Sequence, residues 1–172
     1  MATALAEQRP DKVAALALIN TGPSLDAKIP ESALVRLLTA PVAGPLLWRL
    51  KTEATIRKAA RSAFSSPVDI PDAFIAHTQA MTHRSFSATM GAYRDYLSQR
   101  SIPERIAALG LPVLVIFGGD DRRWRSSSAS AYRDVPGARV ELLPGVGHTP
   151  MIEDPQTTAR LLLDFADAPN PS

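Results

Sequence analysis

Short apolar runs alternate with stretches of helical periodicity along this chain, and the alternation predicts an α/β protein. Residues 13–19 and 112–117 are nearly continuous apolar runs, which are typical of parallel strands buried on both faces. Residues 139–143 are expected to form a third strand. Helices are predicted at residues 2–8, 103–109, 127–134 and 155–166, and Asp154 is the expected N-cap of the last one.

The segment between the first two predicted strands has a helical pattern throughout. In residues 31–100 apolar positions recur three or four residues apart, as at Leu46, Leu47 and Leu50. Four prolines are expected to divide this segment into three or four helices: Pro41, Pro45, Pro67 and Pro71. The chain is therefore predicted to fold as a core, residues 1–30 and 101–168, with a helical insertion at residues 31–100. Residues 169–172 are expected to be a frayed tail.

The composition fits one soluble globular domain. Of 172 residues, 45% are hydrophobic and 21% are charged, which is ordinary for a chain that buries a core. Nineteen basic and seventeen acidic residues give a net charge of only +2, so we expect no basic stripe and no nucleic-acid partner. The apolar runs are far shorter than the roughly 20 residues that cross a membrane, and no membrane partner is expected.

The chain contains no cysteine. This excludes disulfides, thiolate catalysis and cysteine-ligated metals, and it fits a reducing compartment, for which we expect the bacterial cytoplasm. His77 and His83 lie in the helical insertion without an Asp, Glu or Cys cluster at the spacing of a metal site, so we interpret both as solvated or packed. No metal or other cofactor is therefore predicted.

Two side chains with catalytic potential follow the second and third predicted strands. Asp121 lies just after the run that ends in Phe117-Gly118-Gly119, and His148 follows Gly145-Val146-Gly147 in a turn that glycine makes possible. Because open α/β sheets place their ligands at the carboxyl ends of the strands, we expect the two groups to meet there. The neighbouring Asp120 is the alternative to Asp121, since a carboxylate after a strand can also be the cap of the next helix.

The order of these elements resembles the C-terminal half of the α/β-hydrolase fold, over nearly the whole chain. Residues 112–121, PVLVIFGGDD, are similar to that family's P-x-L-x-I-x-G-x-x-D motif, and residues 143–155, LPGVGHTPMIEDP, resemble its histidine loop and last helix. Residues 1–13 resemble the helix that follows the family's nucleophile elbow. The resemblance implies a partial α/β-hydrolase fold in which residues 31–100 are the cap over the site.

The resemblance also assigns roles to the two side chains. His148 would be the general base, and Asp121 would orient its ring and stabilise the imidazolium. The G-x-S-x-G turn that carries the family's nucleophile is not found in the sequence, and Ser24, in Gly22-Pro23-Ser24, lacks the second glycine and is interpreted as a loop serine. The resemblance implies a nucleophile before Met1, so we expect Met1 to be internal to a longer protein and the chain alone to be inactive.

Three functions remain open from the sequence. The first is a serine esterase or carbon–carbon bond hydrolase that acts on small apolar substrates. The second is an epoxide hydrolase or haloalkane dehalogenase, whose nucleophile is an aspartate at the same elbow. The third is a non-catalytic remnant that pairs with another copy or with an N-terminal half, because its first strand would otherwise expose an unpaired edge.

Aromatic side chains are the candidates for binding a small-molecule substrate. We select Trp48, Phe86 and Trp124, although large apolar residues at helical spacing are also typical of an ordinary core. Arg122, Arg123 and Arg125 could attract an anionic substrate or could simply be solvated.

Overall fold

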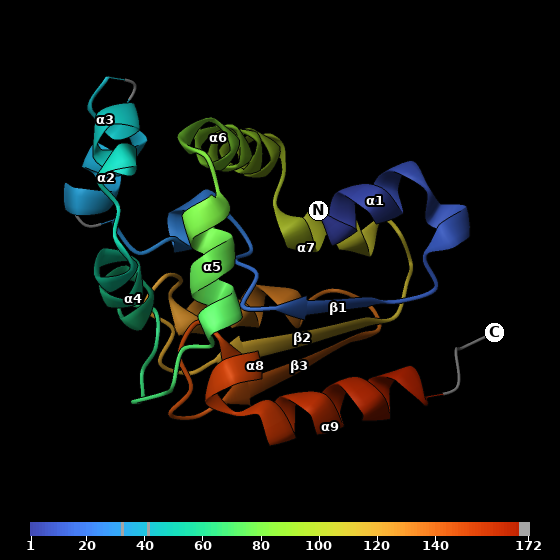
Figure 1. Ribbon diagram of the computed structural model, residues 1–172. Helices are drawn as coiled ribbons and strands as arrows, with labels where there is room; N and C mark the ends of the chain where they lie inside the picture. The colour runs from blue at the N-terminus through green and yellow to red at the C-terminus, as the bar shows by residue number, and fades with distance from the viewer. Residues whose placement is uncertain (32, 41, 169–172) are drawn as a thin grey trace.

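A three-stranded parallel sheet forms the centre of the molecule within the described residues, which are 1–31, 33–40 and 42–168 of the computed structural model (Figure 1). Its strand order is β1-β2-β3, and the strands are β1 (Leu16–Ile19), β2 (Val113–Gly118) and β3 (Ala138–Leu143). Both pairs are parallel and start at Val113, which lies opposite Leu16 on one side and Ala138 on the other. The predicted parallel sheet is confirmed.

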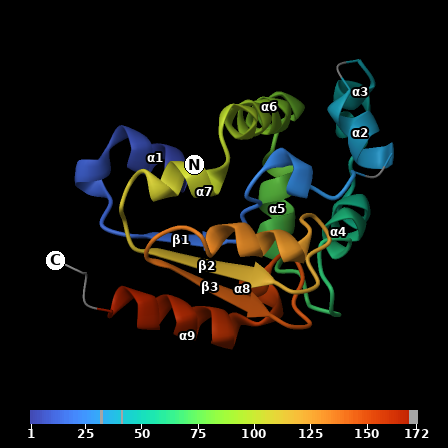
Figure 2. The ribbon, with the colours of Figure 1, turned by 180° about the vertical axis from the view of Figure 1, so that it is seen from behind.

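The central strand β2 is buried on both faces, which explains its unbroken apolar run. Val113, Val115 and Phe117 belong to one core, with side chains from α1 (Ala2–Gln8), α7 (Ile102–Ala107) and η3 (Ser126–Tyr132). Leu114 and Ile116 belong to a second core, on the side of α9 (Pro155–Ala166). Figures 1 and 2 show α9 below the sheet and α1 and α7 above it. Because β2 and β3 are parallel and Gly118 lies opposite Leu143, the carboxyl ends of the two strands lie at the same rim of the sheet.

The helical insertion has more helices than the prolines indicated. The described residues of this segment form five helices: α2 (Ala33–Thr39), α3 (Ala43–Arg49), α4 (Glu53–Arg61), α5 (Asp72–Ala80) and α6 (His83–Gln99). The hydroxyl groups of Thr52 and Thr82 cap the N-termini of α4 and α6. These caps let both helices begin as separate elements at positions that no proline marks. The division into three or four helices was therefore wrong.

The four prolines differ in their effect on the helices. Pro67 and Pro71 lie between α4 and α5, where breaks were predicted, whereas Pro45 lies in the first turn of α3, where its missing N–H costs no helical hydrogen bond. Pro41 and the predicted tail at residues 169–172 are outside the described residues.

Two predicted elements change in extent or type. Strand β1 begins at Leu16 instead of residue 13, because a 3₁₀ turn η1 (Pro10–Lys12) precedes it and its partner β2 starts only at Val113. The predicted α-helix at residues 127–134 is the 3₁₀-helix η3, in which the hydroxyls of Ser128 and Ser130 hydrogen bond to carbonyls three residues back. Such local side-chain bonds compete with α-helical pairing.

The other predicted elements agree closely with the structure. Helices α1 and α9 have the predicted bounds, and the Asp154 carboxylate accepts a hydrogen bond from the Thr157 N–H at 3.1 Å. Two short helices were not predicted: η2 (Leu25–Ala27) and α8 (Pro150–Glu153). No helix in the described part of the chain is long and apolar enough to cross a bilayer.

Glu7 joins α1 to α6 and α7. Its carboxylate accepts hydrogen bonds from the Tyr96 hydroxyl at 2.5 Å and from the Arg105 guanidinium at 3.0 and 3.2 Å. Burial alone raises the pKa of Glu7, but the hydrogen bonds from Tyr96 and Arg105 outweigh burial and hold this pKa below its ordinary value of 4.5. The ionised form of Glu7 therefore stabilises the fold.

Glu7→Gln is expected to lower the free energy of unfolding by about 2 kcal/mol near neutral pH, because the buried Arg105 loses its carboxylate. Since the folded-state pKa is lowered, the difference from wild type is complete above pH 4.5 and is lost as the pH falls through the folded value. Urea unfolding at several pH values measures this difference.

The matched control is Glu53→Gln, which removes the exposed partner of Arg57 on α4 and should change stability by less than about 0.5 kcal/mol. A Glu7→Gln effect that stayed constant well below pH 4.5 would contradict the linkage.

Candidate active site

Asp121 and His148 meet at the rim formed by the carboxyl ends of β2 and β3. The His148 Nδ1 atom lies 3.0 Å from the Asp121 Oδ2 atom. The Asp121 side chain is completely buried, whereas the His148 side chain is 32% exposed. The contact expected from the two strand ends is therefore present, and one partner of the pair remains accessible from outside.

The loop after β2 aims the Asp121 carboxylate. Its Oδ1 atom accepts hydrogen bonds from the backbone N–H groups of Arg123, at 2.6 Å, and Trp124, at 3.2 Å. Oδ2 is left to face the imidazole. Asp120, the alternative in the sequence, is exposed, and only its backbone N–H reaches the histidine loop, at the Val146 carbonyl. Of the two carboxylates, Asp121 is the one that the fold brings to His148.

The ring nitrogens of His148 have distinct environments. Because Asp121 offers only acceptor oxygens when ionised, the Nδ1 atom carries the proton of the neutral ring. The Nε2 atom then presents its lone pair, which is the state that a general base needs. Together the two side chains can take a proton at Nε2 and stabilise the resulting imidazolium.

Asn20 is a site residue that sequence reasoning missed. It directly follows β1, and its Nδ2 atom donates to the Gly147 carbonyl at 2.7 Å while its Oδ1 atom accepts from the Gly118 N–H at 2.6 Å. The buried Asn20 thus ties together the ends of β1 and β2 and the histidine loop. Its φ of +42° is in the left-handed region, which asparagine tolerates better than most residues. A polar residue directly after the apolar run of the first predicted strand was the available signal.

Glu153, at the end of α8, is a second missed residue. Its carboxylate accepts hydrogen bonds from the Gly147 N–H at 3.0 Å and the Thr149 N–H at 3.2 Å, and from the Ser65 N–H and hydroxyl, both at 2.8 Å. Burial alone raises the pKa of Glu153. The hydrogen bonds, led by those from Ser65, outweigh burial and hold this pKa below its ordinary value of 4.5, so the carboxylate is ionised at neutral pH.

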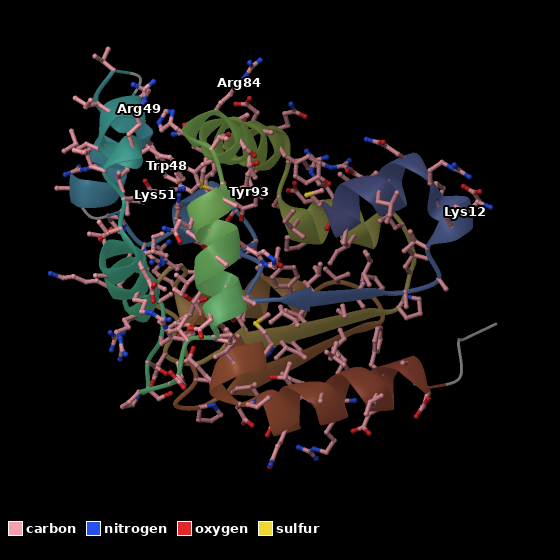
Figure 3. All side chains as sticks on the ribbon, in the orientation of Figure 1. Lys12, Trp48, Arg49, Lys51, Arg84 and Tyr93 are labelled. Carbon is pink, nitrogen blue, oxygen red and sulfur yellow. The ribbon has the colours of Figure 1, made fainter. Side chains whose placement is uncertain are left out.

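A large, mostly apolar cleft opens beside His148. It has a volume of about 1170 Å³ and extends from the rim of the sheet to the helical insertion. All three predicted substrate-binding aromatics line it: Trp48, Phe86 and Trp124. Trp48, Lys51 and Tyr93, labelled in Figure 3, line the same cleft on the side of the insertion. The fold therefore brings the catalytic candidates and the aromatic candidates to one space.

The three aromatic side chains differ in how firmly they are held. The Trp48 ring stacks on Phe86 with centroids 4.9 Å apart, and its indole N–H donates to the Met81 carbonyl at 2.8 Å. Trp124 is only 5% exposed and packs in the main core, so it is a wall of the cleft as well as a core residue. Both interpretations made for these aromatics therefore apply to Trp124.

The arginines after Asp121 have different contacts. Arg122 is exposed and lines the cleft, and Arg123 also lines it and donates to the Ser62 hydroxyl at 2.9 Å. Arg125 instead pairs with Asp26. Two of the three arginines are thus placed beside the cleft.

The remaining polar candidates lie elsewhere or are packed. His77 is exposed on α5, and the His83 Nε2 atom lies 3.1 Å from the Leu38 carbonyl and 3.3 Å from the Ser87 hydroxyl. Ser24 lies at the start of η2 and belongs to no nucleophile turn. The solvated and packed interpretations of His77 and His83 agree with these positions.

A profile of the alpha/beta hydrolase family matches residues 1–161. The chain belongs to the alpha/beta hydrolase family. This confirms the resemblance that the acid loop and the histidine loop indicated. The same fold occurs in the meta-cleavage product hydrolase from Pseudomonas fluorescens IP01, with a TM-score of 0.68, 18% identity, and coverage of 96% of this chain and 60% of that chain.

Two further proteins are similar, one by structure and one by sequence. One is a 2-hydroxy-6-oxo-6-phenylhexa-2,4-dienoate hydrolase from Rhodococcus sp. strain RHA1, with a TM-score of 0.65, 20% identity, and coverage of 97% of this chain and 60% of that one. The other is a monoacylglycerol lipase from Bos taurus, 32% identical over 69 residues, which are 40% of this chain and 20% of the lipase. The chain thus spans about three fifths of the two solved hydrolases and matches a fifth of the lipase.

Proposed function

We propose that this chain supplies the acid–base half of a hydrolase that cleaves esters or carbon–carbon bonds in small apolar substrates. The observation that supports this proposal most directly is the 3.0 Å contact between Asp121 and His148, because His148 also lines the apolar cleft. The nucleophile is a residue outside this sequence, which contains no G-x-S-x-G turn. The chain alone is accordingly inactive.

In the reaction, the His148 Nε2 atom takes the proton of the nucleophile as that group attacks the substrate. The imidazolium that forms is stabilised by Asp121, whose second oxygen stays bound to two backbone N–H groups. His148 then returns the proton to the leaving group, and a water molecule activated at the same Nε2 atom releases the covalent intermediate. Asp121 remains ionised throughout.

The lining of the cleft supports an apolar substrate. Aromatic side chains such as Trp48 and Phe86 offer contact area for an acyl chain or a ring. Arg122 and Arg123 at the same cleft are suited to an acidic group on such a substrate. The names of the similar proteins, a dienoate hydrolase and a lipase, fit substrates of this kind.

Pairing through β1 is a second proposal. Within the described residues β1 pairs only with β2, and unpaired strand edges are templates for another chain. A second copy or an N-terminal half of a hydrolase would add strands there. Light scattering on the purified chain tests pairing with itself, and a stable compact monomer would count against that arrangement.

The purified chain alone is expected to hydrolyse p-nitrophenyl esters no faster than its His148→Ala variant, because no nucleophile is available to its base. The enzyme completed by the upstream reading frame is expected to be active and to lose that activity with His148→Ala. Initial rates measured on both forms give the comparison.

The upstream sequence also separates the two nucleophile classes. An in-frame G-x-S-x-G identifies a serine hydrolase, whereas G-x-D-x-G identifies an aspartate enzyme that acts on epoxides or haloalkanes. Clear turnover by the chain alone that vanished with His148→Ala would overturn the proposed absence of a nucleophile. Stop codons directly upstream, with no activity in any pairing, would favour the non-catalytic remnant.

A further inference from the structure

The Glu153 carboxylate binds backbone N–H groups on both sides of His148. The Gly147 N–H, just before the histidine, donates to the Glu153 Oε2 atom at 3.0 Å, and the Thr149 N–H, just after it, donates to Oε1 at 3.2 Å. Glu153 therefore bridges the Val146–Gly147 peptide group, one residue before the histidine, and the His148–Thr149 peptide group directly after it. Together with the bonds from Asn20 to the Gly147 carbonyl and from the His148 N–H to the Ala63 carbonyl, these bonds restrain the backbone that carries the imidazole.

The same carboxylate reaches the segment between α4 and α5 of the helical insertion. Both the N–H and the hydroxyl of Ser65 lie 2.8 Å from Glu153 Oε2. The Ser65 hydroxyl is also 2.6 Å from the Gly145 carbonyl, and the His148 N–H donates to the Ala63 carbonyl at 3.0 Å. Residues 63–65 are therefore bound along the histidine loop through Glu153 and directly.

Packing supports this arrangement from the apolar side. Ile152, next to Glu153, packs against a small core inside the insertion that contains Ile56, Phe64 and Ile75. Gly147 is needed for the close approach, because a Cβ atom there would lie 2.7 Å from the Ser65 nitrogen and 2.8 Å from Glu153 Oε1. The insertion and the histidine loop thus meet at a close-packed junction centred on Glu153.

We propose that Glu153 is a positioning residue for His148, and that through Ser65 it makes the orientation of the imidazole depend on the position of the helical insertion. The proposal rests on the proposed function, in which His148 is the base. Glu153 touches no reacting atom and acts through the Gly147 and Thr149 peptide groups. A general base must stay within hydrogen-bond reach of the proton it takes, and small displacements of such a group are costly.

The test uses Glu153→Gln and nuclear magnetic resonance of the chain as it is. Glutamine keeps the size of the side chain but replaces one acceptor oxygen with a donor, so at least one flanking N–H loses its partner. We expect hydrogen exchange of the Gly147 and Thr149 amides to accelerate about ten-fold or more, as for the loss of one charged hydrogen bond. The ¹⁵N shifts of His148 should show the Nδ1–H tautomer falling from predominant to a mixture.

Two further variants provide a control and an independent test. Glu104→Gln also removes a carboxylate that accepts a backbone N–H, in the capping box of α7, and it should leave the His148 shifts unchanged. Ser65→Ala keeps Glu153 but removes the hydroxyl link to the insertion, so a smaller change in the same direction is expected. Ser65→Ala decides the matter if Glu153→Gln does not fold.

Unchanged His148 shifts and unchanged exchange at Gly147 and Thr149 in folded Glu153→Gln would overturn the positioning role. Unchanged His148 shifts in Ser65→Ala would overturn the link to the insertion. In the completed enzyme, Glu153→Gln should lower kcat more than it changes KM. Failure of the proposed function has a different signature, because His148→Ala would then leave the rate intact while the tautomer shift in Glu153→Gln persisted.

Discussion

In the completed enzyme, His148→Ala is expected to reduce kcat by a factor on the order of a million, and Asp121→Asn by a factor of about ten thousand, as in serine proteases. His148→Ala removes the imidazole that is proposed to take the proton. Asp121→Asn keeps the shape of the pair, but the amide can offer an N–H to the His148 Nδ1 atom and so favour the wrong tautomer. The contact itself is 3.0 Å long and includes a completely buried carboxylate.

Steady-state rates with a p-nitrophenyl ester measure both effects. Asp120→Asn is the matched control, because Asp120 is adjacent in sequence and has the same side chain but is exposed. Its rate should remain within about two-fold of wild type, as for a surface substitution. A loss of activity in Asp120→Asn equal to that in Asp121→Asn would contradict the assignment of the acid.

Gly118→Ala is expected to destabilise the fold by about 3 kcal/mol or more, the upper end for overpacking a core. A Cβ atom at this position would lie 2.0 Å from the Gly147 carbonyl oxygen and 2.5 Å from that of Val146. Both neighbours are backbone atoms, so relief requires movement of the histidine loop itself. The Gly118 N–H would also lose its alignment with the Asn20 side chain, which lies 2.6 Å away.

Chemical denaturation gives the change in stability, and the His148 Nδ1–H resonance reports whether the loop has moved. Gly91→Ala is the control, because Gly91 is inside α6 and a Cβ atom there meets nothing within 4 Å. That substitution should be neutral or stabilising by about 0.5–1 kcal/mol, since alanine favours helices. Equal stability of Gly118→Ala and wild type would show that the loop can adjust freely.

Much of the core was predictable because the apolar pattern of the sequence corresponds to the positions that are buried in the folded chain. A strand that is buried on both faces is apolar at every position, so β2 could be recognised from Val113 to Phe117 without knowledge of its neighbours. Asp121 and His148 could be paired because parallel strands bring their carboxyl ends to one rim. The aromatic candidates could be named, but the sequence could not separate residues that line the cleft from residues of the hydrophobic core. Periodicity is the same for both, and Trp124 belongs to both.

The helix boundaries in the insertion were less predictable. Prolines indicate breaks only where they interrupt hydrogen bonds, and Pro45 in the first turn of α3 interrupts none. The break before α6 depends on the Thr82 hydroxyl, which accepts a hydrogen bond from the Ser85 N–H. The serine-rich segment of η3 satisfied the helical pattern, yet its own hydroxyls stabilised a tighter turn.

From the amino-acid sequence, hydrophobic periodicity predicted the parallel strands, and the resemblance of the acid loop and the histidine loop to known motifs indicated the family and the acid and imidazole candidates. Only the tertiary structure decided which carboxylate reaches His148 and what holds the imidazole loop. The contacts of Asn20 with Gly147 and of Ser65 with Glu153 join residues 127 and 88 positions apart. No local pattern encodes such pairs, since they exist only once the strands and the insertion have packed together.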